Sequence, residues 1–593
     1  MMKLRSLFVI APFSMLCMAL PAQPETEKAE ARTLKIIPVS DMLMSIPAVR
    51  SPRLGVLTSK WPEDETIELA SQDPFSLVSS DQLAELVRNG LGDEGAETTV
   101  VLKNRTLIVT GNTDNVSKAE KIVEALRRTI TQRIVVQARL YRIKPTDEYP
   151  AVADAARLAT LCKNLPLIWS GHSTAMSGQQ VALSQERFTS YIADVDIEVA
   201  EEAKVGRPKT TTMFEGIRLV VEPHALIGTT DRVLKCQFAI GEKDKDIEDV
   251  STGVENLPQI GIPHLRANSG VFSGRVNHDG ALLLSLQSRA DAGSNLLLVV
   301  QAAKNGLPAG KQTPAGGTLL LPVSAIASQF LRYPRTVYES EGTRGAYPTT
   351  AASDDDEVED DLGELLVNLL NENLGAILDS DDVSLDLTQN GHGSGYILLH
   401  APEHVQVQIT RLLMTMQDFW LGTTEVKLRT VLRPTAATAT TFSEITPSTN
   451  QPTPTYHAVT FPSLHDHAAI VMKGIESRLI RDFEVEIAKK STIANPMMQT
   501  TFNGLAVGFR GAQQGQNSTG QLSVDLQYLP EPRHQPTAQS GGGNLYHARV
   551  RRAHFQHHGR IALDQDLPLG FGPRLQNDQE GARMHQSMRF RRL

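Results

Sequence analysis

The sequence predicts an α+β protein built from two tandem copies of one unit, in which a small α/β module is followed by an antiparallel β-domain. Three observations lead to this prediction. Residues 191–217 recur without gaps at residues 479–505. Helical and alternating apolar patterns precede both segments at nearly the same spacing. Short strands broken by Gly, Pro and Asn follow both segments.

Length and composition are those of a multidomain globular protein. A chain of 593 residues is too long for one hydrophobic core, so we expect several domains of roughly 100 to 200 residues. Hydrophobic residues make up 41%, charged residues 21%, and the formal net charge is -9. Because nucleic acids bind basic surfaces, this charge argues against a nucleic-acid partner.

The N-terminus has the pattern of an export signal. A charged start precedes the apolar run Leu7–Leu20, and Ala22 stands before a polar stretch, so we expect a signal peptide over residues 1–22. Cys17 offers a lipidation alternative, but Leu16 occupies the position where a small residue is required. No other run approaches ~18 apolar residues, so no transmembrane helix is expected. The mature protein is therefore expected to be exported.

Two cysteines, Cys162 and Cys236, remain after the predicted cleavage. One disulfide and two buried thiols both stay open, and a disulfide-stapled scaffold is excluded by the count. Stability must therefore come from packed cores.

Each repeated strand is preceded by the pattern helix, strand, strand, helix, strand. The segment from Leu107 predicts a strand, a turn and a helix, and the segment from Tyr396 repeats it at an offset of 290 residues. Another helix precedes each of these segments and ends at a Gly in a C-cap position. The predicted parts are the signal 1–22, an α/β module 33–145, a β-domain 146–332, an acidic linker 333–361, a second α/β module 362–433 and a second β-domain 434–593.

The repeated strand alternates apolar and acidic residues. The matched pairs are Ile192/Ile480, Asp194/Asp482, Glu198/Glu486, Ala200/Ala488, Pro208/Pro496, Thr212/Thr500, Phe214/Phe502 and Gly216/Gly504, with Asp196/Glu484 as a conservative exchange. Strand periodicity places Tyr191, Ala193 and Val195 on one face and the carboxylates on the other. The candidate functional residues are this acidic row in both copies: Asp194, Asp196, Glu198, Asp482, Glu484 and Glu486.

Two interpretations of the acidic row remain open. A sheet with one face in water requires this alternation, and so does a barrel wall whose polar face lines an aqueous channel. The spacing also offers oxygen ligands for calcium, but a strand lacks the loop and carbonyl donors of a calcium site. No metal and no cofactor are predicted.

Four further residues define the core and turns of the repeat: Phe214, Gly216, Phe502 and Gly504. Gly280 and Gly559 follow the similar sequences His278-Asp279 and His557-His558. We expect both glycines at matching hairpin turns, where glycine supplies a positive φ.

These residues resemble those of a known family. The pattern Ile-x-Asp, followed by alternating apolar and acidic residues up to Ala200, and then the segment Phe214–Pro223, resembles the β-domain of the secretins, the outer-membrane portals of type II and type III secretion. The unit upstream resembles a KH-like secretin N-domain. The resemblance implies a ring-building or partner-docking envelope protein, with a homo-oligomer or other secretion components as partners.

Sequence motifs of common enzymes are absent. The chain contains no GxSxG, P-loop, HExxH or paired-cysteine pattern. His465 and His467 have the spacing of two metal ligands, yet no further ligand lies nearby in the sequence. Arginine and histidine cluster from Arg549 to Arg592, which is typical of basic edge strands that resist pairing and also of surfaces for anionic partners.

The sequence therefore predicts a non-enzymatic, secretin-like component of a bacterial protein-secretion apparatus, either a portal or a scaffold associated with it. The alternative is a stand-alone periplasmic binding or scaffold protein that has lost pore formation.

Overall fold

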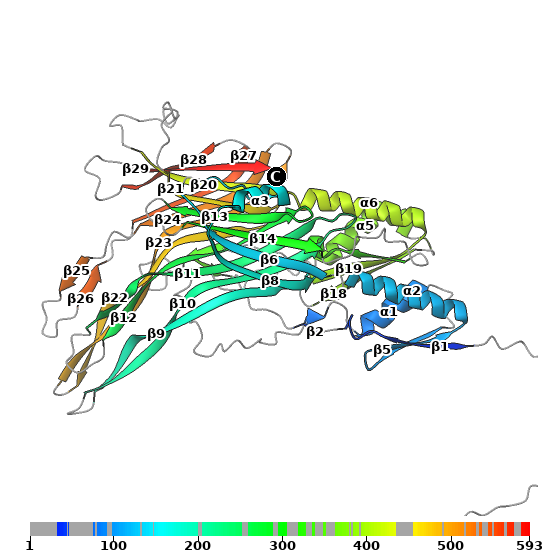
Figure 1. Ribbon diagram of the computed structural model, residues 1–593, viewed down its shortest axis with the longest axis horizontal. Coiled ribbons are helices and arrows are strands. Elements are labelled where there is room, and N and C mark those ends of the chain that lie inside the picture. The colour runs from blue at the N-terminus through cyan, green and yellow to red at the C-terminus, as the bar shows by residue number, and fades with distance from the viewer. Residues whose placement is uncertain are drawn as a thin grey trace, which may run out of the picture.

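The computed structural model shows two small α/β modules next to one end of a large two-sheet β-sandwich (Figure 1). The protein is α+β, and its paired strands are antiparallel. The structure describes residues 32–43, 45–46, 75–76, 80–91, 98–130, 133–145, 147–199, 204–251, 259–288, 295–304, 318–327, 335–338, 348–351, 362–378, 380, 383–390, 393–433, 455–465, 467–488, 491–514, 517–528, 533–536, 544–547, 551–562, 566–574 and 583–592.

The first module is a three-stranded sheet covered on one face by two helices. Its strands are β1 (Thr33–Pro38), β4 (Thr99–Lys103) and β5 (Thr106–Gly111), in the order β1-β5-β4, and its helices are α1 (Ser80–Leu91) and α2 (Thr113–Ile130). Asn104 and Arg105 both have positive φ, which suits the two-residue turn between β4 and β5. The Asn112 side chain accepts a hydrogen bond from the Asn115 amide at 2.8 Å and caps α2.

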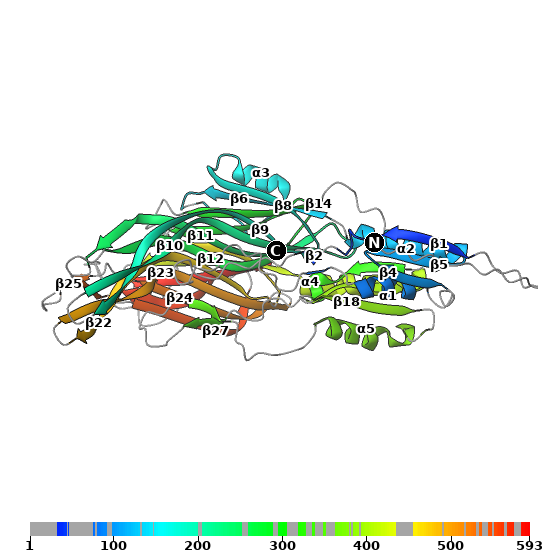
Figure 2. The same cartoon turned by 90° about the horizontal axis from the view of Figure 1, so that it is seen from below.

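The second module has the same plan. Its strands are β15 (Thr318–Pro322), β18 (Ser384–Asn390) and β19 (Gly393–His400), in the order β15-β19-β18, and its helices are α4 (Ser324–Ala327), α5 (Leu362–Leu378) and α6 (Glu403–Trp420). Strand β19 is buried on both faces, since Ile397 and Leu399 pack with the second module's own helices while Tyr396 and Leu398 join the core of the first module. The modules are therefore stacked, as Figure 2 shows.

The fifth strand that we predicted for each module lies elsewhere. Strands β6 (Arg133–Arg142) and β20 (Thr423–Arg433) belong to the sandwich, where β6 pairs with β14 and β8 and β20 pairs with β21 and β29. The third strand is instead β1 in the first module and β15 in the second, and each precedes the helices of its module. Strand β15 was expected in the first β-domain. Alternating apolar residues such as Ile134 and Val136 draw β6 into the sandwich core.

The β-domains predicted as two parts form one sandwich. One sheet has the order β27-β24-β23-β22-β12-β11-β10-β9, and the other has the order β28-β29-β20-β21-β13-β14-β6-β8, with β7 beside β13. The first sheet contains β9 (Val181–Val199), β10 (Lys204–Ala225), β11 (Arg232–Val250), β12 (Ile260–Val276), β22 (Ala469–Ala488), β23 (Ser491–Gln514), β24 (Asn517–Tyr528) and β27 (Arg551–Ala562). The second contains β7 (Val152–Ala153), β8 (Leu167–Met176), β13 (Ala281–Ser288), β14 (Leu296–Lys304), β21 (Thr455–Leu464), β28 (Asp566–Arg574) and β29 (Arg583–Arg592).

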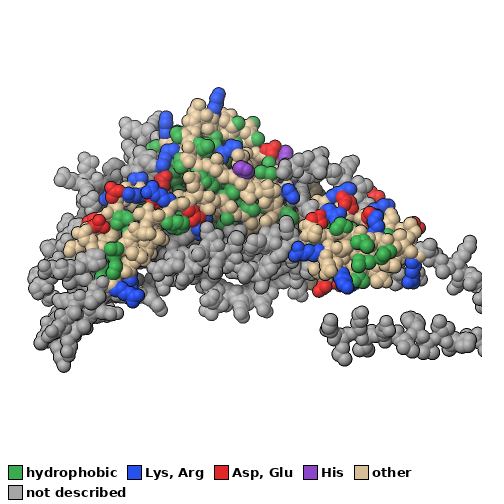
Figure 3. Space-filling model, turned by 60° about the horizontal axis from the view of Figure 1, so that its bottom comes forward, with side chains coloured by type: hydrophobic (Ala, Val, Ile, Leu, Met, Phe, Trp, Pro, Cys, Tyr) green, Lys and Arg blue, Asp and Glu red, His purple; other side chains and the backbone are tan. Residues whose placement is uncertain are grey.

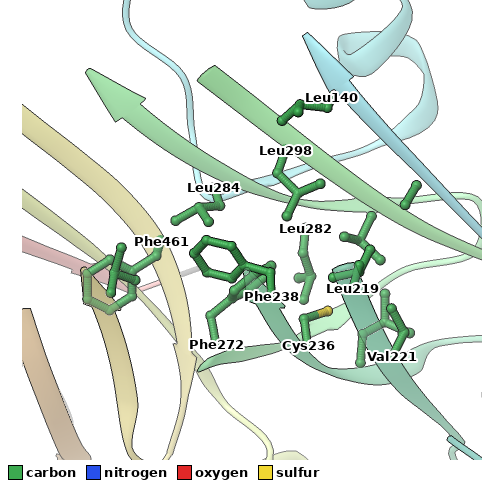
Figure 4. Packing of buried hydrophobic residues seen from close by; sticks show 14 of the residues in the cluster. Leu140, Leu219, Val221, Cys236, Phe238, Phe272, Leu282, Leu284, Leu298 and Phe461 are labelled. Carbon is green, nitrogen blue, oxygen red and sulfur yellow. The ribbon is translucent and has the colours of Figure 1, made fainter. Parts of the chain in front are cut away.

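One continuous hydrophobic core lies between the sheets. Phe238 and Phe272 meet edge to face, with ring centroids 5.9 Å apart, beside Leu282 and Leu284 from the opposite sheet (Figure 4). Phe461 of the C-terminal half belongs to the same core. Helix α3 (Ala155–Cys162) covers the outer face of the second sheet through Leu158.

The remaining described elements are short pairs of strands. They are β2 (Ser45–Ile46) with β3 (Phe75–Ser76), β16 (Arg335–Tyr338) with β17 (Pro348–Ala351), and β25 (Arg533–Pro536) with β26 (Asn544–His547). The predicted signal 1–22 lies outside the described residues, as does the acidic linker 333–361 apart from β16 and β17. In the described part of the chain, no helix has the length and apolar character needed to cross a membrane.

Substitution Phe238→Ala tests the shared core. Phe238 is fully buried, so we expect a loss of about 3–5 kcal/mol in the free energy of unfolding, measured by denaturant titration. Leu167→Ala, at a side chain that is 54% exposed, is the control and is expected to change stability by less than about 0.5 kcal/mol. Equal effects of the two changes would contradict a core at Phe238.

Candidate assembly interface

The two halves of the chain join through both sheets. Strand β12 pairs with β22 from Val271 opposite Ile470 to His264 opposite Ser477, and β13 pairs with β21. The His264 imidazole Nδ1 lies 2.8 Å from the Ser477 hydroxyl across this junction. One edge of the first half, formed by β12 and β13, therefore pairs with the opposite kind of edge of the second half, formed by β22 and β21, which is a head-to-tail contact.

The two halves use the same strand order and register. In the second sheet, the order β13-β14-β6-β8 in the first half matches β28-β29-β20-β21 in the second half. The register matches as well, because Val300 opposite Ala138 corresponds to Met588 opposite Leu428. Strands β8 and β9 thus correspond to β21 and β22, and β27 and β28 correspond to β12 and β13.

The outer edges of the sandwich are the counterparts of the internal junction. Strands β9 and β8 end the two sheets on one side, and β27 and β28 end them on the other. Within the described part of the chain, none of these four strands has a second neighbour in its sheet. Edges of this kind present unpaired backbone N–H and C=O groups that can pair with another chain.

The repeated acidic strands lie in the same sheet, in β9 and β22. Tyr191, Ala193 and Val195 are buried, as the alternation predicts. Each strand carries an irregularity at the same repeat position, because the pairing with the next strand skips Ala193 in β9 and Arg481 in β22. In Figure 1 the ends of both strands project together beyond the sandwich body.

The acidic rows have different cross-strand neighbours. In the first half, Asp194 lies opposite Lys209, with a carboxylate-to-ammonium distance of 3.8 Å, and Asp196 lies opposite Arg207. In the second half, Asp482 lies opposite Met497, Glu484 opposite Asn495 and Glu486 opposite Ile493. The side chains of Asp196, Glu198, Asp482, Glu484 and Glu486 lie outside the described residues, so their exposure to water or a channel remains a prediction.

The predicted core residues of the repeat occupy matching places. Phe214 and Phe502 are buried. A Cβ added to Gly216 would lie 2.0 Å from the Gln185 carbonyl oxygen, and a Cβ added to Gly504 would lie 2.2 Å from the Lys473 carbonyl oxygen. Only glycine permits so close an approach of neighbouring backbones.

The prediction of matching hairpin turns is wrong for Gly559, while Gly280 does end a tight turn, in which its amide donates a hydrogen bond to the Asn277 carbonyl oxygen at 3.0 Å. The turn before Gly280 connects β12 to β13 in the other sheet, and the residue with positive φ in it is Asp279. Gly559 lies inside β27, opposite Gly520. The sequence match that fits the strands is Gly559-Arg560-Ile561 with Gly274-Arg275-Val276, so the similarity between the two histidine-containing sequences aligned the wrong residues.

Sequence reasoning missed the contacts that hold the second module on the sandwich. The Gln417 side chain in α6 accepts a hydrogen bond from the Ile227 amide at 2.9 Å, in the turn between β10 and β11. The Arg275 guanidinium binds Asp231 of that turn at 2.9 Å and Asp418 of α6 at 2.7 Å. These residues lie far apart in the sequence, and no local pattern links them.

A buried polar cluster lies at the same contact. His224 Nε2 is 2.9 Å from a Glu222 carboxylate oxygen, and His224 Nδ1 is 3.1 Å from the Ser324 hydroxyl in α4. The Lys235 ammonium lies 3.4 Å from the same carboxylate. Serine, histidine and glutamate also form hydrolase triads, but His224 is fully buried and Ser324 is 7% exposed, so the geometry fits docking of the module rather than attack on a substrate.

The cluster fixes the charge states of its members. Burial alone would raise the pKa of Glu222, but Lys235 and the hydrogen bonds from His224 and Gln180 outweigh it and hold that pKa far below its usual range. Burial, followed by the charge of Lys235, lowers the pKa of His224. Burial, together with Lys235, His465 and His224, places the pKa of His467 well below its usual value. At neutral pH the carboxylate is therefore ionised, and the imidazoles of His224 and His467 are neutral.

The remaining candidate groups are two cysteines and two histidines. Cys162 and Cys236 are both free thiols. The ring of His465 packs at a tilt against that of Phe419, with centroids 5.4 Å apart, and both His465 and His467 are half-buried. Among the described residues, no group of three or more His, Cys, Asp or Glu side chains is placed to bind a metal ion.

Comparisons with known proteins return secretins at low similarity. No family model matches the chain, and a search of curated proteins finds no match. The InvG secretin domain of the Salmonella SPI-1 injectisome is similar over 48% of this chain and 90% of its own, with 12% identity and a TM-score of 0.22. GspD of the Escherichia coli K12 type II secretion system is similar over 95% of this chain and 90% of its own, with 8% identity and a TM-score of 0.19. The type II secretin XcpQ of Pseudomonas aeruginosa is similar over 52% of this chain and 85% of its own, with 7% identity and a TM-score of 0.22.

Alanine substitution at Gly216 or Gly504 tests the matched close approaches. Either change forces backbones apart, so we expect each to lower the free energy of unfolding by about 1–3 kcal/mol. Gly375→Ala is the control, because no atom lies within 4 Å of the added Cβ, and in helix α5 it is expected to raise stability by about 1 kcal/mol. Tolerance of alanine at both strand positions would contradict the geometry.

Acidification is expected to weaken the buried cluster. Since the folded pKa of His224 lies below its unfolded value, the unfolded chain binds more protons below about pH 6.5, and stability falls as the pH drops through that value. His467 acts in the same direction, and Glu222 adds a loss at still lower pH. His224→Gln should therefore lose less free energy of unfolding than the wild type between about pH 7.5 and about pH 5.5. An equal loss in both proteins would remove His224 as a cause.

Proposed function

We propose that this chain is a non-enzymatic, secretin-like component of a bacterial envelope protein-secretion apparatus, and that it arose by duplication of one module-plus-strand unit. The sequence resemblance at the segments from Ile192 and Phe214 motivates the family. The common strand order and register of the two halves support the duplication. Export rests on the sequence pattern of residues 1–22, and a location in the periplasm or outer membrane of a bacterium rests on the secretin resemblance.

The head-to-tail junction between the halves carries the proposal. Because β27 and β28 correspond to β12 and β13, and β9 and β8 correspond to β22 and β21, the junction can form again between two chains. A heterologous contact of this kind generates a ring when its rotation closes. Closure would pair the free edges of both sandwich sheets and produce a continuous two-sheet wall, the form expected of a portal.

The internal register specifies the register between chains. Val271 lies opposite Ile470 at the junction. Following the strand pairing through both halves, Val271 corresponds to Gln556 and Ile470 corresponds to Ala182. We expect Gln556 of one chain to lie opposite Ala182 of the next.

Sizing in mild detergent tests assembly itself. The full chain is expected to run as a large, heat-resistant ring, with homo-oligomerisation driven by strand pairing. A species with the mass of a single chain would overturn the portal and favour the alternative of a stand-alone periplasmic scaffold.

A disulfide between chains tests the register. Ala182→Cys in one chain and Gln556→Cys in another, with Cys162→Ser in both, should give a cross-linked dimer on oxidation. Ser190→Cys replaces Ala182→Cys in the control, because eight residues along the strand put it roughly 26 Å out of register, beyond disulfide reach. Equal cross-linking in test and control, or none in either, would contradict the proposed pairing.

A further inference from the structure

The first module exposes a hydrophobic sheet face. Leu34 and Ile36 of β1 are 60% and 61% exposed, and Val101 of β4 is 45% exposed. They lie on the face of the sheet opposite α1 and α2, since Ile37, Val100 and Leu107 on the other face are buried in the module core. Figure 3 shows hydrophobic side chains gathered on this module with charged side chains around them. A β-sheet face of this kind requires cover.

The corresponding face of the second module is covered. Strands β1 and β15 each end in a Pro that is followed by Val-Ser. Aligning the two strands on this sequence makes Leu320 the counterpart of Ile36. The same register places Ile36 opposite Ile108 and Leu320 opposite Leu398. Leu320 and Leu398 are buried, together with Tyr396, in one cluster with the residues of α1 and α2. In the second module, therefore, the helices of the first module cover this face.

The helices of the second module lack the equivalent contact. Helix α6 corresponds to α2 at an offset of 290 residues. Ile122, Leu126 and Ile130 of α2 are fully buried, whereas their counterparts Leu412, Met416 and Trp420 of α6 are only partly buried. Helices α1 and α5 differ in the same way, since Leu91 is buried and its counterpart Leu374 is partly exposed.

We propose that the exposed sheet face of the first module binds the exposed face of helices α5 and α6 in the second module of another copy of this chain. The two surfaces are the two halves of a contact that the molecule already makes once within itself. Repeating that contact between chains covers both faces with the same residue types. The inference extends the proposed assembly to the modules, but it rests on module contacts and does not require pairing of the sandwich edges.

Cross-linking between two co-expressed full-length chains tests the contact. One tagged chain carries Ile36→Cys, the other carries Met416→Cys, and Cys162→Ser removes the half-buried thiol from both, while Cys236 is fully buried. A short bismaleimide is expected to join the tagged chain to the untagged one. In the control, Val407→Cys replaces Met416→Cys. Val407 lies on the same helix and is 49% exposed, but its counterpart in α2, Ser117, stays exposed although α2 packs against the second module's sheet. Val407 is therefore expected to lie outside the contact.

The outcomes separate this inference from the proposed function. A dimer with Met416→Cys and only background with Val407→Cys supports the module contact, whether or not rings form. No dimer, or equal yields in both mixtures, overturns it. Rings that form without the module cross-link would overturn the module contact alone, whereas a module cross-link without rings or sandwich cross-links would overturn the portal and leave the module contact standing.

Discussion

Face-to-face packing of two antiparallel sheets over one apolar core is the interaction on which the rest of this structure depends. Each sheet presents alternate residues to the other, and the burial of apolar area at about 25 cal/mol per Å² is the main favourable contribution. Because the core runs from Leu140 in the first half to Phe461 in the second, neither half can complete its core alone. The junction of the halves is therefore fixed by the same burial that stabilises each of them.

That constraint gives the molecule two unlike ends. A head-to-tail contact uses one edge of each half, so a chain of two halves always retains one edge of each kind. The stacked modules follow the same logic, with a sheet face at one end of the stack and a helix face at the other. Strand edges and module faces thus supply two separate head-to-tail contacts to the proposed assembly.

The contact between the sandwich and the second module combines apolar packing with paired polar groups. Leu226, Ile227 and Val233 of the sandwich lie in one buried cluster with residues of α6. The turn from Leu226 to Asp231 contacts α6 directly through Gln417, and Arg275 links Asp231 to Asp418 of α6. His224 contacts Ser324 at the start of α4. Buried polar groups are costly unless they are paired, so this arrangement specifies one position of the module rather than adding much stability. In the second half Ala512 stands at the repeat position of His224, and the cluster is not repeated in sequence.

Local periodicity by itself determined the α+β class, the helices, the repeated strands and the buried face of Tyr191, because residues two or four apart along the chain decide which side of an element is apolar. The close approaches at Gly216 and Gly504 also left a trace, since both glycines stand at matched positions. Only the tertiary structure decided that β6 and β20 leave the modules, that both β-domains share one core, and that Gly559 lies within a strand. Strand partnership depends on which edges and faces meet over hundreds of residues, and no window of sequence contains both partners.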